Sequence, residues 1–178
     1  KRKKRLNNTF VVDSLYKNRK DGRNLAMWMS TIVKNTGGLR NTTCGHITLY
    51  DNTTGDNNVA VGGGALSNNT TANDNTSVGC GSLLDNTTGA CNTAVGTGAL
   101  ANNTTTSEST AVGSAAMLNS TTGGANTALG RSALRNLTTG DANVAVGICA
   151  GSDASMINIT TESNRFIAGH NDITNAYV

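Results

Sequence analysis

Histidines and cysteines could hold a metal or act as nucleophiles in this 178-residue chain, and they are few. His46 and His170 lie far apart, and neither has a partner at the spacing of a zinc site. In a trimer, three copies of His170 could meet on the axis and hold a metal or an anion, but a hydrogen-bonded histidine is the simpler interpretation. The four cysteines show no Cys-x-x-Cys spacing, so we expect small buried thiols and no disulfide framework.

Acidic and glycine-rich segments also lack a catalytic pattern. The nine acidic residues after residue 34 are scattered, so no carboxylate pair for glycoside hydrolysis can be assigned. Gly62-Gly63-Gly64 lacks the Gly-Lys-Ser/Thr sequence of a phosphate-binding loop, and the calcium-binding Gly-Gly-x-Gly-x-Asp nonapeptide is absent. We therefore expect a protein that is not an enzyme and that needs no cofactor or metal.

The dominant feature of the chain is a repeat of 17 residues. An apolar residue followed by glycine recurs at this interval, as Val61-Gly62, Val78-Gly79, Val95-Gly96, Val112-Gly113, Leu129-Gly130 and Val146-Gly147. One step back lands on Cys44-Gly45, so residues 35–153 form seven tandem units of about 17 residues. A fixed short period of this kind predicts a solenoid, which is a structural building element.

The unit at residues 86–102 indicates how each coil is built. Residues 92–96 read Asn-Thr-Ala-Val-Gly, a short alternating run with β-branched residues that suits a strand, and residues 86–89 read Asn-Thr-Thr-Gly, which favours a turn. Stacked coils would pair equivalent strands in parallel, about 4.8 Å apart. The predicted fold class is all-β: a parallel β-solenoid, or β-roll, of seven coils that forms an intertwined or side-by-side homotrimer.

Equivalent side chains of successive coils should form ladders. We expect two aliphatic ladders to be the core, one made of Val61, Val78, Val95, Val112, Leu129 and Val146, and the other of Leu66, Leu83, Leu100 and Leu134. Two such side chains bury little apolar area for the 17 residues that each coil must order, so a single roll is marginal. We therefore predict that the small residues opposite the valine ladder form a trimer interface, made of Ala60, Ala94, Ala111, Ala128 and Ala145.

Two further sets of residues recur with the repeat. A threonine column could order water in an ice-binding solenoid, and it consists of Thr53, Thr70, Thr87, Thr104, Thr121 and Thr138. Asn-x-Thr sequences, which are acceptors for N-glycosylation, include Asn41, Asn52, Asn86 and Asn103. Each of these asparagines also falls at a turn or a strand start, so the repeat explains them without glycans.

The repeat Asn-Thr-Ala-Val-Gly-x-x-Ala-Leu resembles the repeats of trimeric viral and phage fibres, and the β-roll heads of trimeric autotransporter adhesins. Residues 92–100, 126–134 and 143–147 carry the match. Residues 165–178 look like the segment that precedes an intramolecular-chaperone autoprotease domain in viral fibres. That domain is absent from the sequence, which would fit either a trimmed fibre or a partial chain. The resemblance implies a homotrimeric shaft.

Both ends of the chain are expected to differ from this shaft. Residues 1–34 hold ten Lys or Arg against two Asp, whereas the remainder holds four Arg against nine acids. This basic arm and cap contains the attachment candidates Lys1, Arg2, Lys3, Lys4, Arg5 and Trp28. Nucleic-acid binding is a weaker alternative, because aromatic residues are sparse around the basic block. Residues 154–178, after the repeat breaks, are expected to form a C-terminal cap or tip.

The leading hypothesis is a structural protein of a virion, exposed on the virion surface as a rigid trimeric shaft. Its N-terminal region would bind a capsid or tail protein, and its C-terminal tip would bind a host surface receptor. No run of 18 apolar residues exists, so membrane insertion is not expected. The alternatives are a cell-surface trimeric adhesin head and, less favoured, an ice-binding solenoid.

Overall fold

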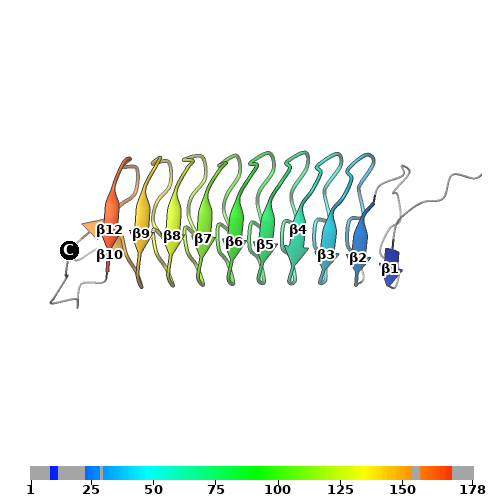
Figure 1. The fold of residues 1–178 in the computed structure, drawn as a ribbon, viewed down its shortest axis with the longest axis horizontal. Helices are drawn as coiled ribbons and strands as arrows, with labels where there is room; N and C mark the ends of the chain where they lie inside the picture. Colours follow the sequence, from blue (N-terminus) through cyan, green and yellow to red (C-terminus); the bar gives the residue numbers. More distant parts are fainter. Residues whose placement is uncertain (1–8, 12–22, 29, 154–156, 170–178) are drawn as a thin grey trace, which may run out of the picture.

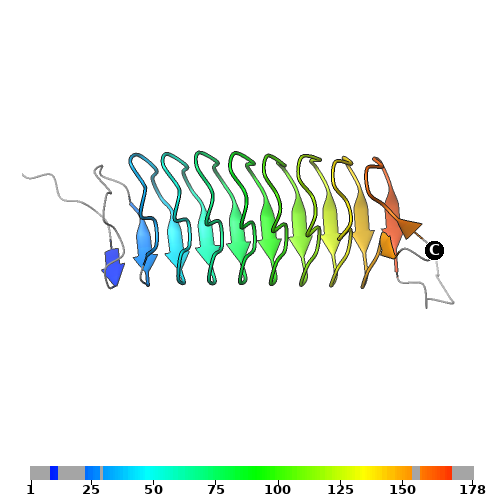
Figure 2. The same cartoon turned by 180° about the vertical axis from the view of Figure 1, so that it is seen from behind.

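The computed structural model describes residues 9–11, 23–28, 30–153 and 157–169. These residues form an elongated stack of coils, and each coil contributes one short strand to a common sheet (Figure 1). The view from behind shows how the turns of each coil carry the chain around the stack to the next strand (Figure 2). The described part contains no helix, and therefore none that could cross a membrane.

Ten parallel strands make up the main sheet. They are β1 (Thr9–Val11), β2 (Leu25–Met27), β3 (Thr42–Cys44), β4 (Val59–Val61), β5 (Thr76–Val78), β6 (Thr93–Val95), β7 (Thr110–Val112), β8 (Thr127–Leu129), β9 (Val144–Val146) and β12 (Phe166–Ala168). Strands β2 to β9 pair in sequence order at the 17-residue interval of the repeat, so that Thr93 pairs with Thr110. The predicted parallel β-solenoid is confirmed, while the homotrimer stays a prediction.

The solenoid extends beyond the predicted limits at residues 35 and 153. Strand β2 pairs with β3 and strand β12 pairs with β9, so residues 25–34 and 157–169 add coils to the same stack. Both added strands keep a buried apolar residue at their middle position. Ala26 and Ile167 are buried at the position that Ala94 occupies in β6. The shaft therefore includes parts of the chain that we expected to be separate ends.

The last coil is longer because it carries a hairpin. Strands β10 (Ser152–Asp153) and β11 (Ile157–Asn158) pair antiparallel outside the main sheet. The chain then takes 22 residues, instead of 17, to reach the equivalent position, as from Thr138 to Thr160. This insertion explains why the repeat breaks after residue 153, and parallel pairing resumes at β12.

A thin apolar core runs along the stack. Leu66, Leu83, Leu100 and Leu134 are fully buried, which confirms this predicted core ladder. A second buried column packs in the same cluster and includes Ala65, Ala99, Ala116 and Ala133. Burial of each leucine contributes roughly 1.5–3 kcal/mol, so no single coil holds much apolar free energy.

Buried asparagines fill much of the remaining interior, and one set lies inside the turns. This turn ladder consists of Asn35, Asn52, Asn69, Asn86 and Asn103, all fully buried. The side-chain Nδ2 of Asn86 donates to Oδ1 of Asn69 in the preceding coil (2.8 Å) and to the carbonyl of Gly89 in its own turn (3.0 Å). Each amide therefore closes its own turn and binds the turn of a neighbouring coil.

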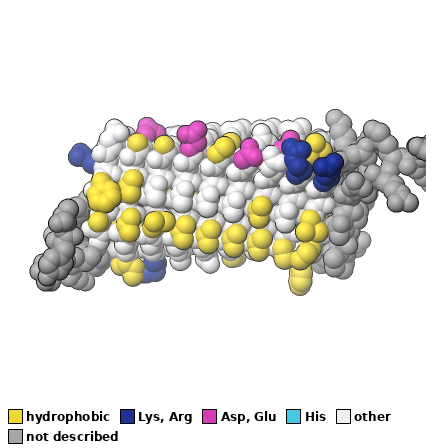
Figure 3. Space-filling model, in the orientation of Figure 1, with side chains coloured by type: hydrophobic (Ala, Val, Ile, Leu, Met, Phe, Trp, Pro, Cys, Tyr) yellow, Lys and Arg dark blue, Asp and Glu magenta, His cyan; other side chains and the backbone are white. Residues whose placement is uncertain are grey.

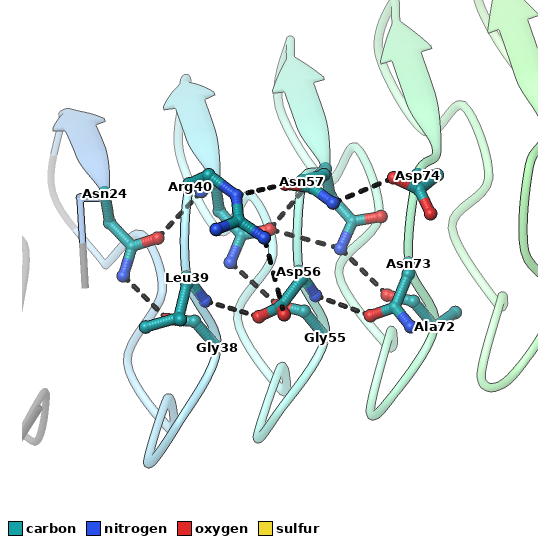
Figure 4. A network of polar contacts seen from close by, with 12 residues as sticks. Asn24, Gly38, Leu39, Arg40, Gly55, Asp56, Asn57, Ala72, Asn73 and Asp74 are labelled. Carbon is teal, nitrogen blue, oxygen red and sulfur yellow. Dashed lines mark hydrogen bonds and ion pairs between the residues drawn. The ribbon is translucent and has the colours of Figure 1, made fainter.

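A second set of buried asparagines precedes the strands. This strand ladder consists of Asn24, Asn41, Asn58, Asn75, Asn92, Asn126 and Asn143. Ser109 occupies the equivalent position in the coil between Asn92 and Asn126. Oδ1 of Asn58 accepts from the backbone N–H of Asn75 (3.0 Å), and Nδ2 of Asn75 donates to the carbonyl of Gly89 (2.9 Å). Figure 4 shows the same arrangement at Asn24 and Gly38. We expected such asparagines only to mark turns or strand starts, whereas their amides also link neighbouring coils.

Left-handed backbone positions produce the corners of each coil. The core residue Leu100 has a φ of 52°, which costs a residue with a Cβ about 1–2 kcal/mol and is offset by burial of its side chain. Gly96 has a φ of 133° and packs directly on the next coil. A Cβ at Gly96 would lie 2.6 Å from the carbonyl carbon of Gly113, so glycine is required at this corner.

We expect Gly96→Ala to destabilise the solenoid far more than Gly81→Ala. Both glycines have a positive φ, but a Cβ at Gly81 would meet nothing within 4 Å. Gly81→Ala should therefore cost only the strain of the left-handed backbone, about 1–2 kcal/mol, whereas Gly96→Ala adds a collision with backbone atoms. Urea unfolding followed by circular dichroism would measure the difference. Equal losses for the two variants would contradict close backbone packing at Gly96.

Candidate interaction surface

The outward side of the main sheet forms one continuous face. Side chains alternate between the two sides of a strand, so the middle residue points inward and the flanking residues point outward. We call the outward residues of β2 to β9 and β12 the strand face. Its first column is Leu25, Thr42, Val59, Thr76, Thr93, Thr110, Thr127, Val144 and Phe166, and its second is Met27, Cys44, Val61, Val78, Val95, Val112, Leu129, Val146 and Ala168.

The prediction that the valine ladder lies in the core is wrong. Val95, Val112, Leu129 and Val146 are 36%, 38%, 39% and 41% exposed, and Val61 and Val78 are half-buried. These residues lie on the strand face. The two asparagine ladders and the leucine ladder fill the inside of the coil and leave room for only a small side chain on the strand.

The predicted trimer interface is wrong for the same reason. The residues assigned to it, Ala60, Ala94, Ala111, Ala128 and Ala145, are all 0% exposed inside a single chain. Each is the middle residue of its strand, between two outward neighbours. No other chain can reach this column while the coil is folded, so any contact between chains must use another surface.

The strand face carries no charged side chain in the strands that define it. Figure 3 shows hydrophobic side chains in a row along the long axis, with acidic side chains of the same view on a separate line above it. Both ends of the face are bulky, because Met27 and Trp28 are exposed at one end and Phe166 is 75% exposed at the other. A long, narrow and apolar strip of this kind is typical of a protein–protein contact.

Charged residues lie at the turns, where they bind one another along the stack. Nε of Arg40 donates to Oδ1 of Asn57 (2.6 Å), and Nδ2 of Asn57 donates to Oδ1 of Asp74 (2.9 Å) (Figure 4). Oδ1 of Asp56 accepts from the backbone N–H of Leu39 (2.7 Å). These carboxylates are already used by the protein, and the described residues hold no group of three side chains that could bind a metal.

Two exposed ionisable groups have shifted pKa values with structural causes. The hydrogen bond and charge of Asp51, 2.7 Å away, raise the pKa of Lys34 above 10.5. Backbone N–H groups of Thr160 and of the turn around Glu162 lower the pKa of Glu162 below 4.5. The Lys34 contact is thus lost only as the pH rises above 10.5, and the Glu162 contact only as the pH falls below 4.5. Neither group changes its charge near neutral pH.

The predicted attachment residues are only partly described. Trp28 is 61% exposed directly after β2, where it takes the place that glycine holds in the following coils, and its φ is 116°. It adjoins the strand face through Met27, so it belongs to the same apolar strip. The basic residues Lys1, Arg2, Lys3, Lys4 and Arg5 lie outside the described residues, and so does His170.

Two other expectations change with the structure. The hydroxyl of Thr53 donates to the carbonyl of Thr70 (2.9 Å), and Thr70 and Thr87 repeat this bond, so the threonine column uses its donors between coils. The cysteines are free thiols, but Cys80 and Cys91 are exposed instead of buried. They occupy outward positions of the coil, which the Cys content alone could not indicate.

Sequence reasoning missed the strand face because the run Thr-Ala-Val fits either orientation of the strand. A usable signal was present: the middle residue is small in coil after coil, as expected where two asparagines and a leucine share the interior. A comparison with protein-family models, with curated proteins and with solved structures finds no match. The function must therefore be argued from the strand face and the stack.

We expect Ala94→Leu to destabilise the folded chain, whereas Val95→Leu should have little effect. Ala94 is fully buried, and extra carbon atoms in a packed interior typically cost 1–3 kcal/mol. Val95 points outward, and Leu129 already occupies the equivalent position two coils on, so its change should stay within about 0.5 kcal/mol. Thermal unfolding would compare the two variants. If Ala94→Leu altered the solution mass and left stability unchanged, the alanine column would be an interface after all.

Proposed function

We propose that this chain is the rigid shaft of a virion fibre, with three copies packed side by side along a common axis. The observation that supports the proposal most is the strand face, which carries no charged side chain from β2 to β9 and in β12 and includes an exposed aliphatic column along β6 to β9. Ten strands at about 4.8 Å per step give a shaft about 43 Å long between the first and last strand. Such a shaft would hold a distal end away from the particle.

A second copy of the same chain fits the strand face by its repeat. From β4 to β9 the face presents one Thr or Val and one Val or Leu in each coil, so a matching surface must repeat at the same axial step of about 4.8 Å. A parallel copy of this chain provides that step at every coil, whereas an irregular protein surface would match only a few. Cyclic packing around an axis would cover the face on each chain and leave the charged turns in water. The choice of three chains, and not two, follows from the resemblance of the repeat to those of trimeric fibres.

The roles of the two ends rest on the sequence. The basic block at residues 1–5 would bind an acidic surface of a capsid or tail protein, and the exposed Trp28, directly after β2, would contribute to the same contact. The opposite end, with Phe166 and the β10–β11 hairpin, would face the host and contact a surface receptor. The work is mechanical, and the proposal needs no catalysis and no cofactor.

Two alternatives use the same stack. A cell-surface adhesin head would also be trimeric and would differ in where the chain is anchored. An ice-binding solenoid is less favoured, because the hydroxyls of Thr53, Thr70 and Thr87 are already bonded to backbone carbonyls.

The strand face can be tested through the mass of the protein in solution. We expect light scattering to give three times the 18.2 kDa mass of one chain. The double variant Val95→Lys, Val112→Lys should weaken association more than tenfold, because it would bury unpaired charges. The matched control Thr88→Lys, Thr105→Lys places the same charges on exposed turn positions of neighbouring coils and should assemble normally. A wild-type monomer at micromolar concentration, or equal masses for both variants, would contradict the assembly.

The location of the chain separates the fibre from the adhesin. Antibodies against the folded shaft, used with gold labels in electron microscopy, should mark thin projections on purified virus particles. Preparations of cell envelopes from the same source serve as the comparison. Label confined to the cell envelope would favour the adhesin head and overturn the virion assignment.

A further inference from the structure

The chain carries many N-glycosylation acceptor sequences, and the fold divides them into two groups. An Asn-x-Ser/Thr sequence normally indicates a surface loop, because the attached glycan is bulky and needs solvent. Here the period of 17 residues places one group inside the coil and the other on its outer surface. The division depends on the fold and is independent of whether the protein serves as a fibre.

The inner group belongs mainly to the turn ladder, with Asn52, Asn69, Asn86 and Asn103 in Asn-Thr-Thr sequences. All four side chains are 0% exposed. Nδ2 of Asn103 donates to Oδ1 of Asn86 (2.6 Å) and to the carbonyl of Thr106 (3.3 Å), so both of its hydrogens are in use. Asn41 and Asn75 of the strand ladder are acceptor sequences of the same buried kind.

The outer group lies one residue before the turn ladder, where the side chain points the other way. Asn68, Asn102 and Asn158 are exposed, and Asn119 and Asn136 are half-buried. Each begins an Asn-x-Thr sequence. Asn68 and Asn69 are therefore adjacent acceptors with opposite environments, and Asn102 and Asn103 form a second such pair.

We propose that N-glycosylation of the turn ladder and folding of this solenoid exclude one another, whereas glycans on the outer group are compatible with the fold. In the transfer reaction, Nδ2 attacks the anomeric carbon of a lipid-linked diphospho-oligosaccharide. The N–C bond forms, the bond from carbon to the diphosphate breaks, and Nδ2 loses a proton. A modified ladder asparagine then keeps one N–H for two buried acceptors, and its sugar has no space between the coils.

The order of synthesis makes the ladder vulnerable. The backbone N–H of Thr87 donates to the carbonyl of Thr104, and Oδ1 of Asn86 accepts from Nδ2 of Asn103, so the contacts of the Asn86 turn are complete only after the following coil has been made. A nascent chain that passes an oligosaccharyl transferase would expose Asn86 before that bond can form. The solenoid must therefore fold in a compartment without this enzyme.

Two variants separate the groups. The outer-only variant removes the buried acceptors with Thr54→Ala, Thr71→Ala, Thr88→Ala, Thr105→Ala, Thr43→Ala and Ser77→Ala. The first four threonines are exposed, and alanine already occupies the strand position of the last two in other coils. The inner-only variant keeps the buried acceptors and carries Asn68→Gln, Asn102→Gln, Asn119→Gln, Asn136→Gln and Asn158→Gln, together with Asn7→Gln, which removes the acceptor that lies outside the described residues. Both variants, made in bacterial cytosol, should fold with the same circular dichroism as the wild-type chain.

The test is cell-free translation into endoplasmic-reticulum microsomes, followed by protease treatment and glycopeptide mapping by mass spectrometry. The outer-only variant should carry glycans and remain in the protease-resistant fraction. The inner-only variant should carry ladder glycans only in the protease-sensitive fraction. A ladder glycan in the resistant fraction would overturn the exclusion. A translated inner-only chain that folds without any ladder glycan would overturn the claim that the ladder is open to modification during synthesis. Unfolding of the modified outer-only variant would overturn the compatibility of the outer group.

Discussion

Each coil buries asparagine amides that it cannot satisfy alone, and this constraint links the coils into one structure. A buried amide without hydrogen-bond partners costs several kcal/mol in an apolar surrounding. In the turn ladder, Asn86 finds one acceptor in its own turn and the other on Asn69 in the preceding coil. Neighbouring coils are therefore required for folding, in addition to the backbone bonds of the sheet. A chain with this interior behaves as a one-dimensional stack whose end coils are the least satisfied.

The same interior explains why the outer surface is available for assembly. Two asparagines, a leucine and a small residue occupy the inside of a coil, so the larger strand residues must point outward. Valine and threonine at these places give the strand face its apolar character, whereas charges stay at the turns. The proposed cyclic assembly would cover this face on each chain. The asparagines and leucines of the interior thus account for the internal packing, and they also leave exposed the face that the proposed fibre would use.

The period, the parallel strands and the leucine ladder could be predicted from sequence because all three depend only on spacing. The sequence could not predict which strand side chains point inward, because Thr93, Ala94 and Val95 alternate equally well with either face inward. The volume available inside a 17-residue coil decides which side of the strand faces inward. That volume depends on asparagines that local rules assign to turns. The coil limits were missed for two reasons. After Ala26 the chain has Met27-Trp28 in place of the apolar-glycine pair, and Ile167 follows a coil of 22 residues instead of 17.

The long last coil shows how the stack can carry an insertion without losing its register. The hairpin β10–β11 adds residues outside the main sheet, yet Ile167 returns to the buried column and pairs with Ala145. The stack therefore requires the inward residues and the ladder contacts, and it tolerates extra length on the outer turns. New surfaces can be added at one coil while the neighbouring coils keep their hydrogen bonds. Because the last coil needs only to preserve these few inward positions, its outer residues could form the proposed recognition tip without disturbing the stack.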